Sequence, residues 1–499
     1  MNLLPSILKQ WKEFSPISEL KSGKRGPIYR LLYEVLKSNI EKGDLPSGYY
    51  LPSSRLLATE ADLSRSTVNR AYELLIFDGL VVAKQGRGYL IDNQMDLNLK
   101  KQEVIKELDP NLSHLAQSFL EVSRTALPQK NGIEKSGLAF RPGVPPVDLF
   151  PVRRWMMLTQ KYWKEIEYSS LDYKSTSGVQ SLKETLVNYL RIDRNIECHP
   201  DQILVVSGSL QSLYLIANTL VNPGDRVLAE NPTFENVVSV FRGLRANLEP
   251  LNLDENGAII PLLKDLDSKP KVVHLTPSCQ YPLGYQMSYE RKKQWIEFAQ
   301  KNNTYLIEND YEHEIVNYKQ QSSTLFSQDF QGNTIYLSTF NRLLHPSIRI
   351  GFMIVPFKIL PAVKAIMNHS HRFVPPSIQM VLNDFIKQSF LQVHIKNIWQ
   401  TSHERKATFL KAAQQYLPNW EMKDTAALHL LGYFNQSPIK NSEFDDVAFS
   451  ELLSDQNIAV QSLSRLYFNE PVKNGLVLGY SSVPSSVILQ KLQQWSLLY

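Results

Sequence analysis

The chain has 499 residues, of which 43% are hydrophobic and 10% aromatic, and its formal net charge is +5 at pH 7. This length predicts two or three domains with large apolar cores. No run of about 18 apolar residues is present, so a membrane-spanning helix is excluded. The first residues lack the basic region and cleavage site of a signal peptide. Two cysteines, Cys198 and Cys279, argue against a disulfide framework and for a reducing, cytoplasmic location, and no metal site is expected.

The positive charge is concentrated at the N-terminal end. Residues 1–91 contain 13 Lys and Arg against 9 Asp and Glu, so this stretch carries +4 of the net charge of +5. A small nucleic-acid-binding module would require such a basic excess.

Residues 7–92 have the pattern of a compact first module. Apolar residues recur at helical spacing over 27–43, and Gly43 is a stop signal. Ser53 or Ser54 can cap a second, short helix, and Ser64 a third. Two short β-branched segments then surround a Gly-rich tip over 81–91. Three helices followed by a hairpin predict a winged helix-turn-helix.

The remainder of the chain predicts a larger α/β domain. Residues 93–135 are polar and mixed, and we assign them to a linker. Over 136–499, short β-rich runs such as QILVVSG, RVLAENP, KVVHLTP, TYLIEND, NTIYLSTF and RIGFMIV alternate with helical patterns, which indicates a mainly parallel sheet. From about Asn397 the pattern is that of a smaller α+β subdomain.

The segment LPSSRLLATEADLSRSTVNRAYELLIFDGLVVAKQGRGYLI resembles the GntR-type winged helix along its whole length. In a helix-turn-helix, the first residues of the second helix enter the major groove, and long donors and small hydroxyls suit base edges and phosphates. The wing can reach the DNA backbone. The alternative is a winged helix used for protein contacts, with its arginines merely solvated. The predicted DNA-binding residues are Arg55, Arg65, Ser66, Thr67, Asn69, Arg70, Gln85, Gly86 and Arg87.

Residues 138–499 resemble the fold-type I aminotransferase domain of MocR/GabR-type transcription regulators. The resemblance lies in FRPGVPPVDLFPVRRW, DQILVVSGSLQSL, LAENPTFENV, TPSCQYPLGYQMS, LIENDYEHEI and STFNRLLHPSIRIGF, in that order. It implies a pocket for pyridoxal 5′-phosphate (PLP), a Schiff-base lysine, and an aspartate at the pyridinium nitrogen. Ser207, Gly208 and Ser209, at a strand-to-helix turn, would hold the phosphate with Arg349. Tyr311 would bond the phenolic oxygen, and Phe234 would lie near the ring.

Several positions of this pocket depart from the family pattern. Arg342 stands where the resemblance places the Schiff-base lysine, and a guanidinium is always protonated and cannot act as the amine nucleophile. Asn309 replaces the pyridinium aspartate, and Val477 stands where an arginine would hold a substrate carboxylate. Cys279 replaces a histidine. Together these changes predict a pseudo-aminotransferase without catalytic residues and without covalent PLP.

Two interpretations of Arg342 stay open. If residues 342–349 are helical, Arg342 and Arg349 share one face and can bind a phosphate or carboxylate. Alternatively, Arg342 pairs with an acid such as Asp310 and the pocket is vestigial. We therefore expect a cytoplasmic, homodimeric transcription regulator that binds double-stranded DNA, with a small anionic effector possible. The alternatives are an active PLP-dependent aminotransferase and a regulator that holds PLP without a covalent bond.

Overall fold

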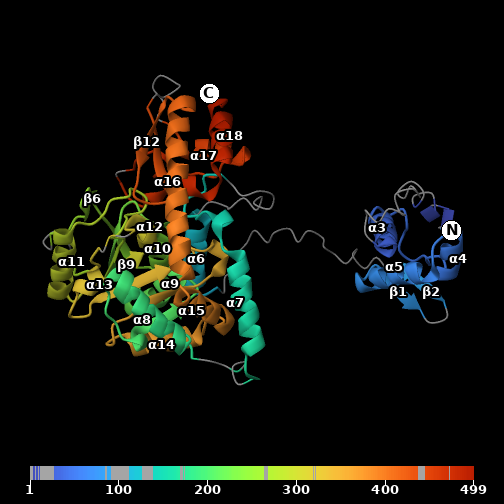
Figure 1. The fold of residues 1–499 in the computed structure, drawn as a ribbon, viewed down its shortest axis with the longest axis horizontal. Helices are drawn as coiled ribbons and strands as arrows, with labels where there is room; N and C mark the ends of the chain where they lie inside the picture. The colour runs from blue at the N-terminus through green and yellow to red at the C-terminus, as the bar shows by residue number, and fades with distance from the viewer. Residues whose placement is uncertain are drawn as a thin grey trace. The chain divides into compact units, whose positions relative to one another are not determined.

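The computed structural model describes residues 4–5, 7–8, 11, 27–84, 87–91, 112–125, 139–168, 172, 175–262, 268–318, 320, 322–435, 444–470 and 472–498. The chain divides into two compact units, Met1–Leu112 and Ser113–Tyr499 (Figure 1). No helix in these ranges is both long and apolar enough to cross a membrane.

The first unit is a winged helix-turn-helix, as predicted. Its helices are α3 (Ile28–Glu41), α4 (Ser54–Glu60) and α5 (Arg65–Phe77), followed by the antiparallel strands β1 (Val81–Lys84) and β2 (Gly88–Ile91). The hydroxyl of Ser53 accepts the Leu56 amide at 3.2 Å and caps α4, and Ser64 accepts the Thr67 amide at 3.1 Å and caps α5. The capped helices close on a buried apolar core.

Part of the predicted linker is a helix of the second unit. Within residues 93–135, His114–Thr125 form α6, which packs on α10 (Glu235–Gly243). The boundary between the units lies at residues 112 and 113. The apolar residues of α6 pack against α10, and a local sequence pattern does not reveal such a tertiary contact.

A seven-stranded sheet forms the centre of the second unit, and its strand order is β3-β11-β10-β9-β8-β4-β5. All neighbouring pairs are parallel except those that involve β11, so the predicted mainly parallel sheet is confirmed. The strands are β3 (Ile203–Val206), β4 (Arg226–Glu230), β5 (Asn247–Leu251), β8 (Val272–Leu275), β9 (Tyr305–Asp310), β10 (Thr334–Thr339) and β11 (Gly351–Ile354). The half-exposed edge strand β5 lacks a continuous apolar run and was not predicted.

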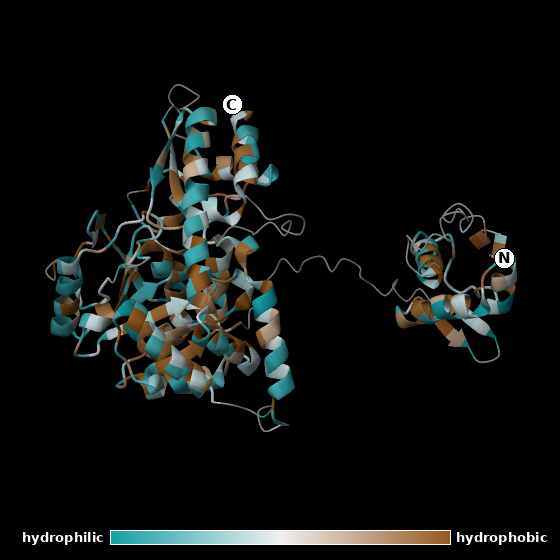
Figure 2. Ribbon diagram, in the orientation of Figure 1, coloured by the Kyte–Doolittle hydropathy of each residue, from teal (hydrophilic) through white to brown (hydrophobic). Residues whose placement is uncertain are grey.

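Helices cover both faces of this sheet. On one face, α9 (Ser209–Leu220), α10 and α14 (Leu360–His369) share a core with β3, β10 and β11. On the other face lie α7 (Val152–Glu165), α8 (Gln180–Arg194), α15 (Pro376–Lys387) and the start of α16 (Phe390–Tyr416). Figure 2 shows the strands largely brown and the outer turns of α11 (Tyr289–Asn302) teal, as expected for a doubly covered sheet. The short helices α12 (His313–Val316) and α13 (Leu325–Gln328) follow β9.

The predicted smaller subdomain is present, but its boundary lies inside a helix. The 27-residue α16 runs through position 397 and joins the two parts. Beyond it, a four-stranded sheet has the order β12-β13-β15-β14. The subdomain consists of β12 (Trp420–Asp424), β13 (Leu430–Phe434), α17 (Asp446–Asp455), β14 (Gln461–Ser462), β15 (Leu476–Leu478) and α18 (Ser485–Ser496).

Candidate functional site

The start of α5 presents polar side chains at the surface of the first unit. Arg65 and Ser66 are exposed, and Thr67 and Asn69 are half-buried. The cap residue Ser64 lies 2.8 Å from the hydroxyls of both Ser66 and Thr67. The hydroxyls therefore hold one another in place at the end of the helix that a helix-turn-helix directs into the major groove.

The arginines of this surface have different environments. The exposed guanidinium groups of Arg55, Arg65 and Arg87 form no ion pair or hydrogen bond with any residue that the structure describes. Arg70 instead lies over the Tyr29 ring, 4.6 Å from its centroid, so part of its role is to join α5 to α3. The predicted wing residues Gln85 and Gly86 lie outside the described residues.

In the second unit, Ser207, Gly208 and Ser209 form the turn between β3 and α9. Gly208 has φ = +129° and precedes the helix, so the first amides of α9 have no acceptor within the helix. Ser207 is occupied internally, because both its amide and its hydroxyl donate to the Gln211 side chain, at 2.6 and 2.9 Å. The Ser212 amide is the first that donates within the helix, to the Gly208 carbonyl, so the amides from Ser209 to Gln211 have no intrahelical acceptor.

Arg349 lies beside this turn, as the resemblance implies. A methyl group added to Gly208 would lie 4.0 Å from the Arg349 guanidinium and 2.9 Å from the Asn341 amide nitrogen. Arg349 is exposed, and its guanidinium has no ion pair or hydrogen bond within the described part of the chain. A guanidinium, an amide and a helix start therefore converge on one point, which is the arrangement that holds a phosphate or carboxylate.

The helical geometry considered for residues 342–349 is wrong. The chain forms turns and then a short 3-10 helix, Pro346–Ile348, and Arg349 has the left-handed φ of +52°. Pro346 and the backbone reversal at Arg349 interrupt any continuous helix. Arg342 and Arg349 consequently do not share one face of a helix.

Arg342 is held by a carboxylate, and that carboxylate belongs to Glu312. Arg342 Nη1 lies 2.9 Å from Glu312 Oε1, and the Glu312 side chain is fully buried. The guanidinium also lies over the rings of Tyr311 and Phe234, at 5.3 and 5.8 Å from their centroids. A methyl group on Gly143 would overlap it. The position to which the resemblance assigns a lysine thus holds a paired and closely packed arginine.

The other oxygen of Glu312 ties this pair to the smaller subdomain, because Oε2 accepts the Leu428 amide at 3.0 Å. Asp310, which we considered as the partner of Arg342, instead pairs with the buried Arg194 and accepts the Tyr336 hydroxyl at 2.7 Å. The Arg194 guanidinium keeps the pKa of Asp310 below its usual value although burial opposes this. The sequence reasoning missed both Arg194 and Glu312. Glu312 follows Tyr311 in an acid-rich run, which was the one available signal.

Buried polar atoms line the position expected for the cofactor ring. The Asn309 amide nitrogen lies 3.3 Å from His274 Nε2, and burial lowers the His274 pKa to about 3, so this imidazole is neutral. Asn309 Oδ1 and the Tyr311 hydroxyl have no hydrogen-bond partner among the described residues. Phe234 is stacked on Tyr281 with 4.0 Å between centroids. The Asn309 amide, the neutral His274 imidazole and the Tyr311 hydroxyl are polar groups without charge.

Cys279 and Val477 form apolar surroundings for Tyr311. Cys279 is buried beside Tyr311, and burial raises the pKa of its thiol. Val477 is fully buried on β15 and packs with Tyr281, Tyr311 and Leu431. The position that the resemblance gives to a carboxylate-binding arginine therefore presents hydrocarbon.

The residues at this site suit the phosphate and the polar ring atoms of PLP, but they do not suit its protonated ring nitrogen or its covalent attachment. Arg349 and the first turn of α9 suit its phosphate, and the unpartnered Tyr311 hydroxyl and Asn309 amide suit polar atoms of its ring. A bound PLP supplies an electron sink in enzymes, which requires a protonated ring nitrogen, and neutral Asn309 provides no charge to hold that proton. Arg342 offers no amine for a covalent bond.

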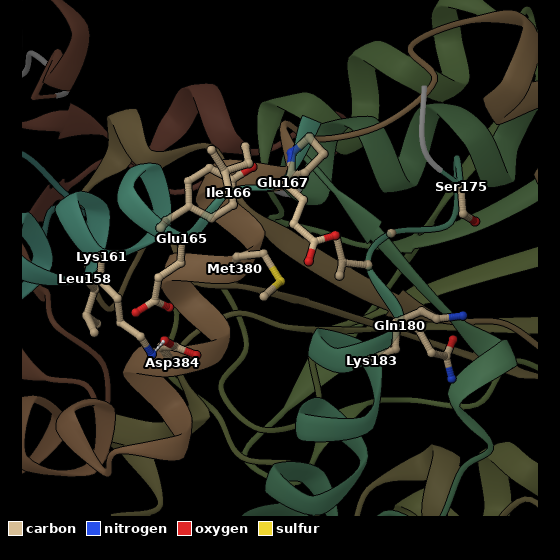
Figure 3. Close-up of a pocket in the computed structure, with 14 residues that line it drawn as sticks. Leu158, Lys161, Glu165, Ile166, Glu167, Ser175, Gln180, Lys183, Met380 and Asp384 are labelled. Atoms are coloured by element: carbon tan, nitrogen blue, oxygen red, sulfur yellow. Dashed lines mark hydrogen bonds and ion pairs between the residues drawn. The ribbon is translucent and has the colours of Figure 1, made fainter. Parts of the chain in front are cut away.

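A separate cavity lies away from these residues. It has a volume of about 610 Å³, and its walls come from α7, α8 and α15, where Lys161 and Asp384 are paired at 2.9 Å (Figure 3). None of the predicted site residues lines it.

Comparison with known proteins identifies both units. Residues 28–91 match the bacterial regulatory proteins of the gntR family, and residues 143–473 match aminotransferase class I and II. The chain therefore belongs to the aminotransferase class I and II family, fused to a GntR-type DNA-binding domain, which is the architecture of MocR-type transcription regulators.

Individual relatives agree with this assignment. The chain is 27% identical over 460 residues to the probable rhizopine catabolism regulatory protein MocR of Rhizobium meliloti, covering 92% of this chain and 90% of that protein. It is 26% identical to the uncharacterized HTH-type transcriptional regulator YhdI of Bacillus subtilis (strain 168), covering 96% and 98%. The crystal structure of an archaeal alanine:glyoxylate aminotransferase superimposes with a TM-score of 0.67 at 25% identity, covering 78% of this chain and 95% of that one.

Proposed function

We propose that this MocR-type regulator binds specific DNA as a homodimer and that its aminotransferase-like unit is a ligand-binding domain without transaminase activity. The observation that carries the loss of activity is the ion pair between Arg342 and the buried Glu312 at the position of the cofactor lysine. Transamination requires an amine that bonds to the cofactor and moves a proton, and a paired guanidinium does neither.

The reading surface proposed for DNA is the start of α5 with Arg55 on α4 and Arg87 at the wing. These three exposed arginines and the hydroxyls of Ser66 and Thr67 lack competing ionic partners within the described residues. Phosphate contacts would fix the orientation of the module, and the side chains at the start of α5 would read base edges.

Exposed apolar side chains on α7 support the homodimer. Val152, Met156 and Trp163 are 62%, 53% and 56% exposed, and their spacing places them on one side of the helix. A cluster of large exposed apolar side chains marks an interaction surface. A second copy of the chain would cover it and would bring two winged helices to one DNA molecule.

The effector proposed for the pocket is a small molecule that carries a phosphate or carboxylate. Arg349 and the first amides of α9 supply an anion site without an internal counter-charge from the described residues. The unpartnered Tyr311 hydroxyl and Asn309 oxygen favour a ligand with a polar ring, and PLP held without a covalent bond is the second candidate.

A reduction experiment tests the loss of covalent chemistry. The full-length protein is mixed with PLP and borohydride, and its peptides are mapped by mass spectrometry. We expect no pyridoxyl adduct in the peptide that contains residue 342 and no amino-group transfer to a keto acid. Arg342→Lys should form at most a small amount of adduct at that residue, and it should remain inactive because Asn309 and Val477 are unchanged.

Transamination by the unmodified protein would contradict the proposal, since another lysine would then have to serve the cofactor. An unmodified protein that retains PLP through a reducible bond would contradict it as well. If PLP binds and is removed by dialysis, the second candidate for the effector gains support.

A further inference from the structure

Another cavity of the second unit is lined by buried polar side chains. It lies between α8, α12 and α16 and has a volume of about 320 Å³. Its buried lining includes Tyr189, His313, Glu314 and Asn317, and the exposed Gln392 shows that it reaches the surface. None of the described site residues that the sequence predicted lines this cavity.

His313 is a buried side chain of this cavity without a hydrogen-bond partner. It is 4% exposed, and neither of its ring nitrogens forms a hydrogen bond with a described residue. Burial lowers the pKa of His313 to about 3, so the ring is neutral and carries one proton. Nδ1 lies 3.5 Å from the ionised Asp310 carboxylate, which favours the proton on Nδ1 and leaves Nε2 as an acceptor. A ligand that donates a hydrogen bond to Nε2 would satisfy this buried group.

Two carboxyl groups line the same cavity. Glu314 Oε1 accepts the Tyr189 hydroxyl at 2.7 Å, and Oε2 lies 3.3 Å from His313 Nδ1. Asp193, near the end of α8, is exposed, and its carboxyl forms no ion pair with a described residue. No Lys or Arg is among the described residues that line the cavity. The charges of the lining therefore favour a cation and disfavour an anion.

Asn317 supplies a hydrogen-bond donor. Its Oδ1 accepts Gln286 Nε2 at 3.3 Å, whereas its buried Nδ2 has no partner within the described part of the chain. A ligand oxygen would satisfy this donor. The cavity thus combines acceptors for an N–H group with a donor for an oxygen atom.

We propose that this cavity binds a small organic ammonium compound that also carries a hydroxyl or carbonyl oxygen. The ammonium group would donate to His313 Nε2 and to the Glu314 carboxylate, with Asp193 as a second counter-charge. The oxygen would accept from Asn317 Nδ2. The volume lies at the lower end of the range of about 300–1,000 Å³ that ligand pockets occupy, which suits a small compound. This site is separate from the anion site beside Arg349, and it does not require DNA binding.

Binding of the ammonium compound should release a proton from Glu314. Burial raises the pKa of Glu314 to about 8, so its carboxyl group is mostly protonated at pH 7 in the free protein. A cation beside it favours the ionised form and lowers this pKa. The titratable and charged groups around Glu314 are Tyr189, Asp193 and Arg194 of α8 and Asp310 and His313 beside it in the chain, and α16 contributes the neutral Gln392 and Ile395.

Calorimetry with three matched probes tests the charge preference. The compounds 3-amino-1-propanol, 1,3-propanediol and 3-hydroxypropionate share a three-carbon chain and a hydroxyl group but are cationic, neutral and anionic at pH 7. The full-length protein should bind the amine and neither of the other two. Binding heats in two buffers of different ionisation enthalpy should show that a proton is released with the amine.

Variants of the full-length protein assign the binding to this cavity. Glu314→Gln keeps an acceptor for Tyr189 but removes the charge, so it should bind the amine about tenfold more weakly and without proton release. Asp193→Asn changes an exposed side chain that folding does not require and should weaken the amine by about twofold. The matched control is Glu184→Gln, an exposed acid of the same α8 that does not line the cavity, and it should bind the amine like the wild type.

Three results would overturn this proposal. Equal binding of the amine and the diol by the wild type would refute the charge preference. Unchanged affinity for the amine in both Glu314→Gln and Asp193→Asn would place the amine elsewhere. No binding of the amine by the wild type would leave a cavity that holds only water. Each result is obtained without DNA and without PLP, so failure of this site is distinguishable from failure of the proposed function.

Discussion

The winged helix and the aminotransferase-like pocket both present arginines, but they differ in where the counter-charge lies. Arg55, Arg65 and Arg87 are exposed and have no ionic partner in the described residues, so they are available to an anion from another molecule. Arg342 has its carboxylate within the fold, at 2.9 Å and fully buried. Arg349 resembles the first group although it lies in the second unit. This difference distinguishes arginines that are available to a ligand from an arginine that is already paired inside the fold.

The largest effect should follow from removing the internal pair. Arg342→Met leaves the Glu312 carboxylate buried without a cation, which should lower the free energy of unfolding of the second unit by about 3–5 kcal/mol, measured by denaturant titration. The control is Lys161→Met, which breaks an exposed pair of the same 2.9 Å length and should cost less than about 1 kcal/mol.

Adding Glu312→Gln to Arg342→Met should recover part of the loss, because the two groups act on one interaction. If Arg342→Met and Lys161→Met lower the free energy of unfolding equally, the buried pair of Arg342 contributes no more to stability than an exposed pair. The comparison of the two regions would then be wrong.

The second prediction addresses the unpaired cations of the winged helix. Arg65→Ala should weaken binding to a selected DNA fragment by about 1–3 kcal/mol if Arg65 reads a base, and it should leave stability nearly unchanged. Arg87→Ala should weaken all sequences equally and reduce the slope of log affinity against log salt by about one. Fluorescence anisotropy at several salt concentrations measures both. Equal binding by Arg65→Ala and by the control Lys42→Ala, a change at the end of α3, would remove Arg65 from the reading surface.

A third prediction uses a buried acid of the second unit. Burial raises the pKa of Glu314 to about 8, and its Oε1 accepts the Tyr189 hydroxyl at 2.7 Å. Between the unfolded pKa of about 4.3 and the folded value, the native state binds more protons, so stability falls as pH rises through this window. The slope from one such group is at most about 1.4 kcal/mol per pH unit.

Glu314→Gln keeps an acceptor for Tyr189 and should flatten this dependence between pH 5 and 8, as seen in melting temperatures of the second unit. The melting temperature of the winged helix should not change. An equally steep profile in Glu314→Gln would show that other groups cause the pH dependence.

The smallest expected effect concerns Arg349. A phosphate-bearing compound such as PLP, present at about five times its dissociation constant, should stabilise the wild type by about 1 kcal/mol. Arg349→Ala should lose this increase in melting temperature, whereas Arg191→Ala, at an exposed position on α8, should keep it. A shift of the same size in Arg349→Ala would place the anion elsewhere.

Local patterns in the sequence predicted the order and type of most elements. Ser53 and Ser64 cap their helices because a cap needs a side chain only three residues from its amide partner. The short β-rich runs in TYLIEND and NTIYLSTF became central parallel strands, and nearly all residues of these strands are buried on both faces of the sheet. The motif order likewise placed Arg349 beside the Gly208 turn.

Tertiary structure alone decided which charged side chains pair with each other in the second unit. Asp310 ends strand β9 and faces Arg194, whereas Glu312 follows the strand, where alternation no longer sets the side on which a residue lies. Residues far apart in the chain, from Gly143 to Leu428, surround the Arg342–Glu312 pair. The docking of α6 on Gly243 likewise depends on close packing between distant segments, and no local pattern contains that information.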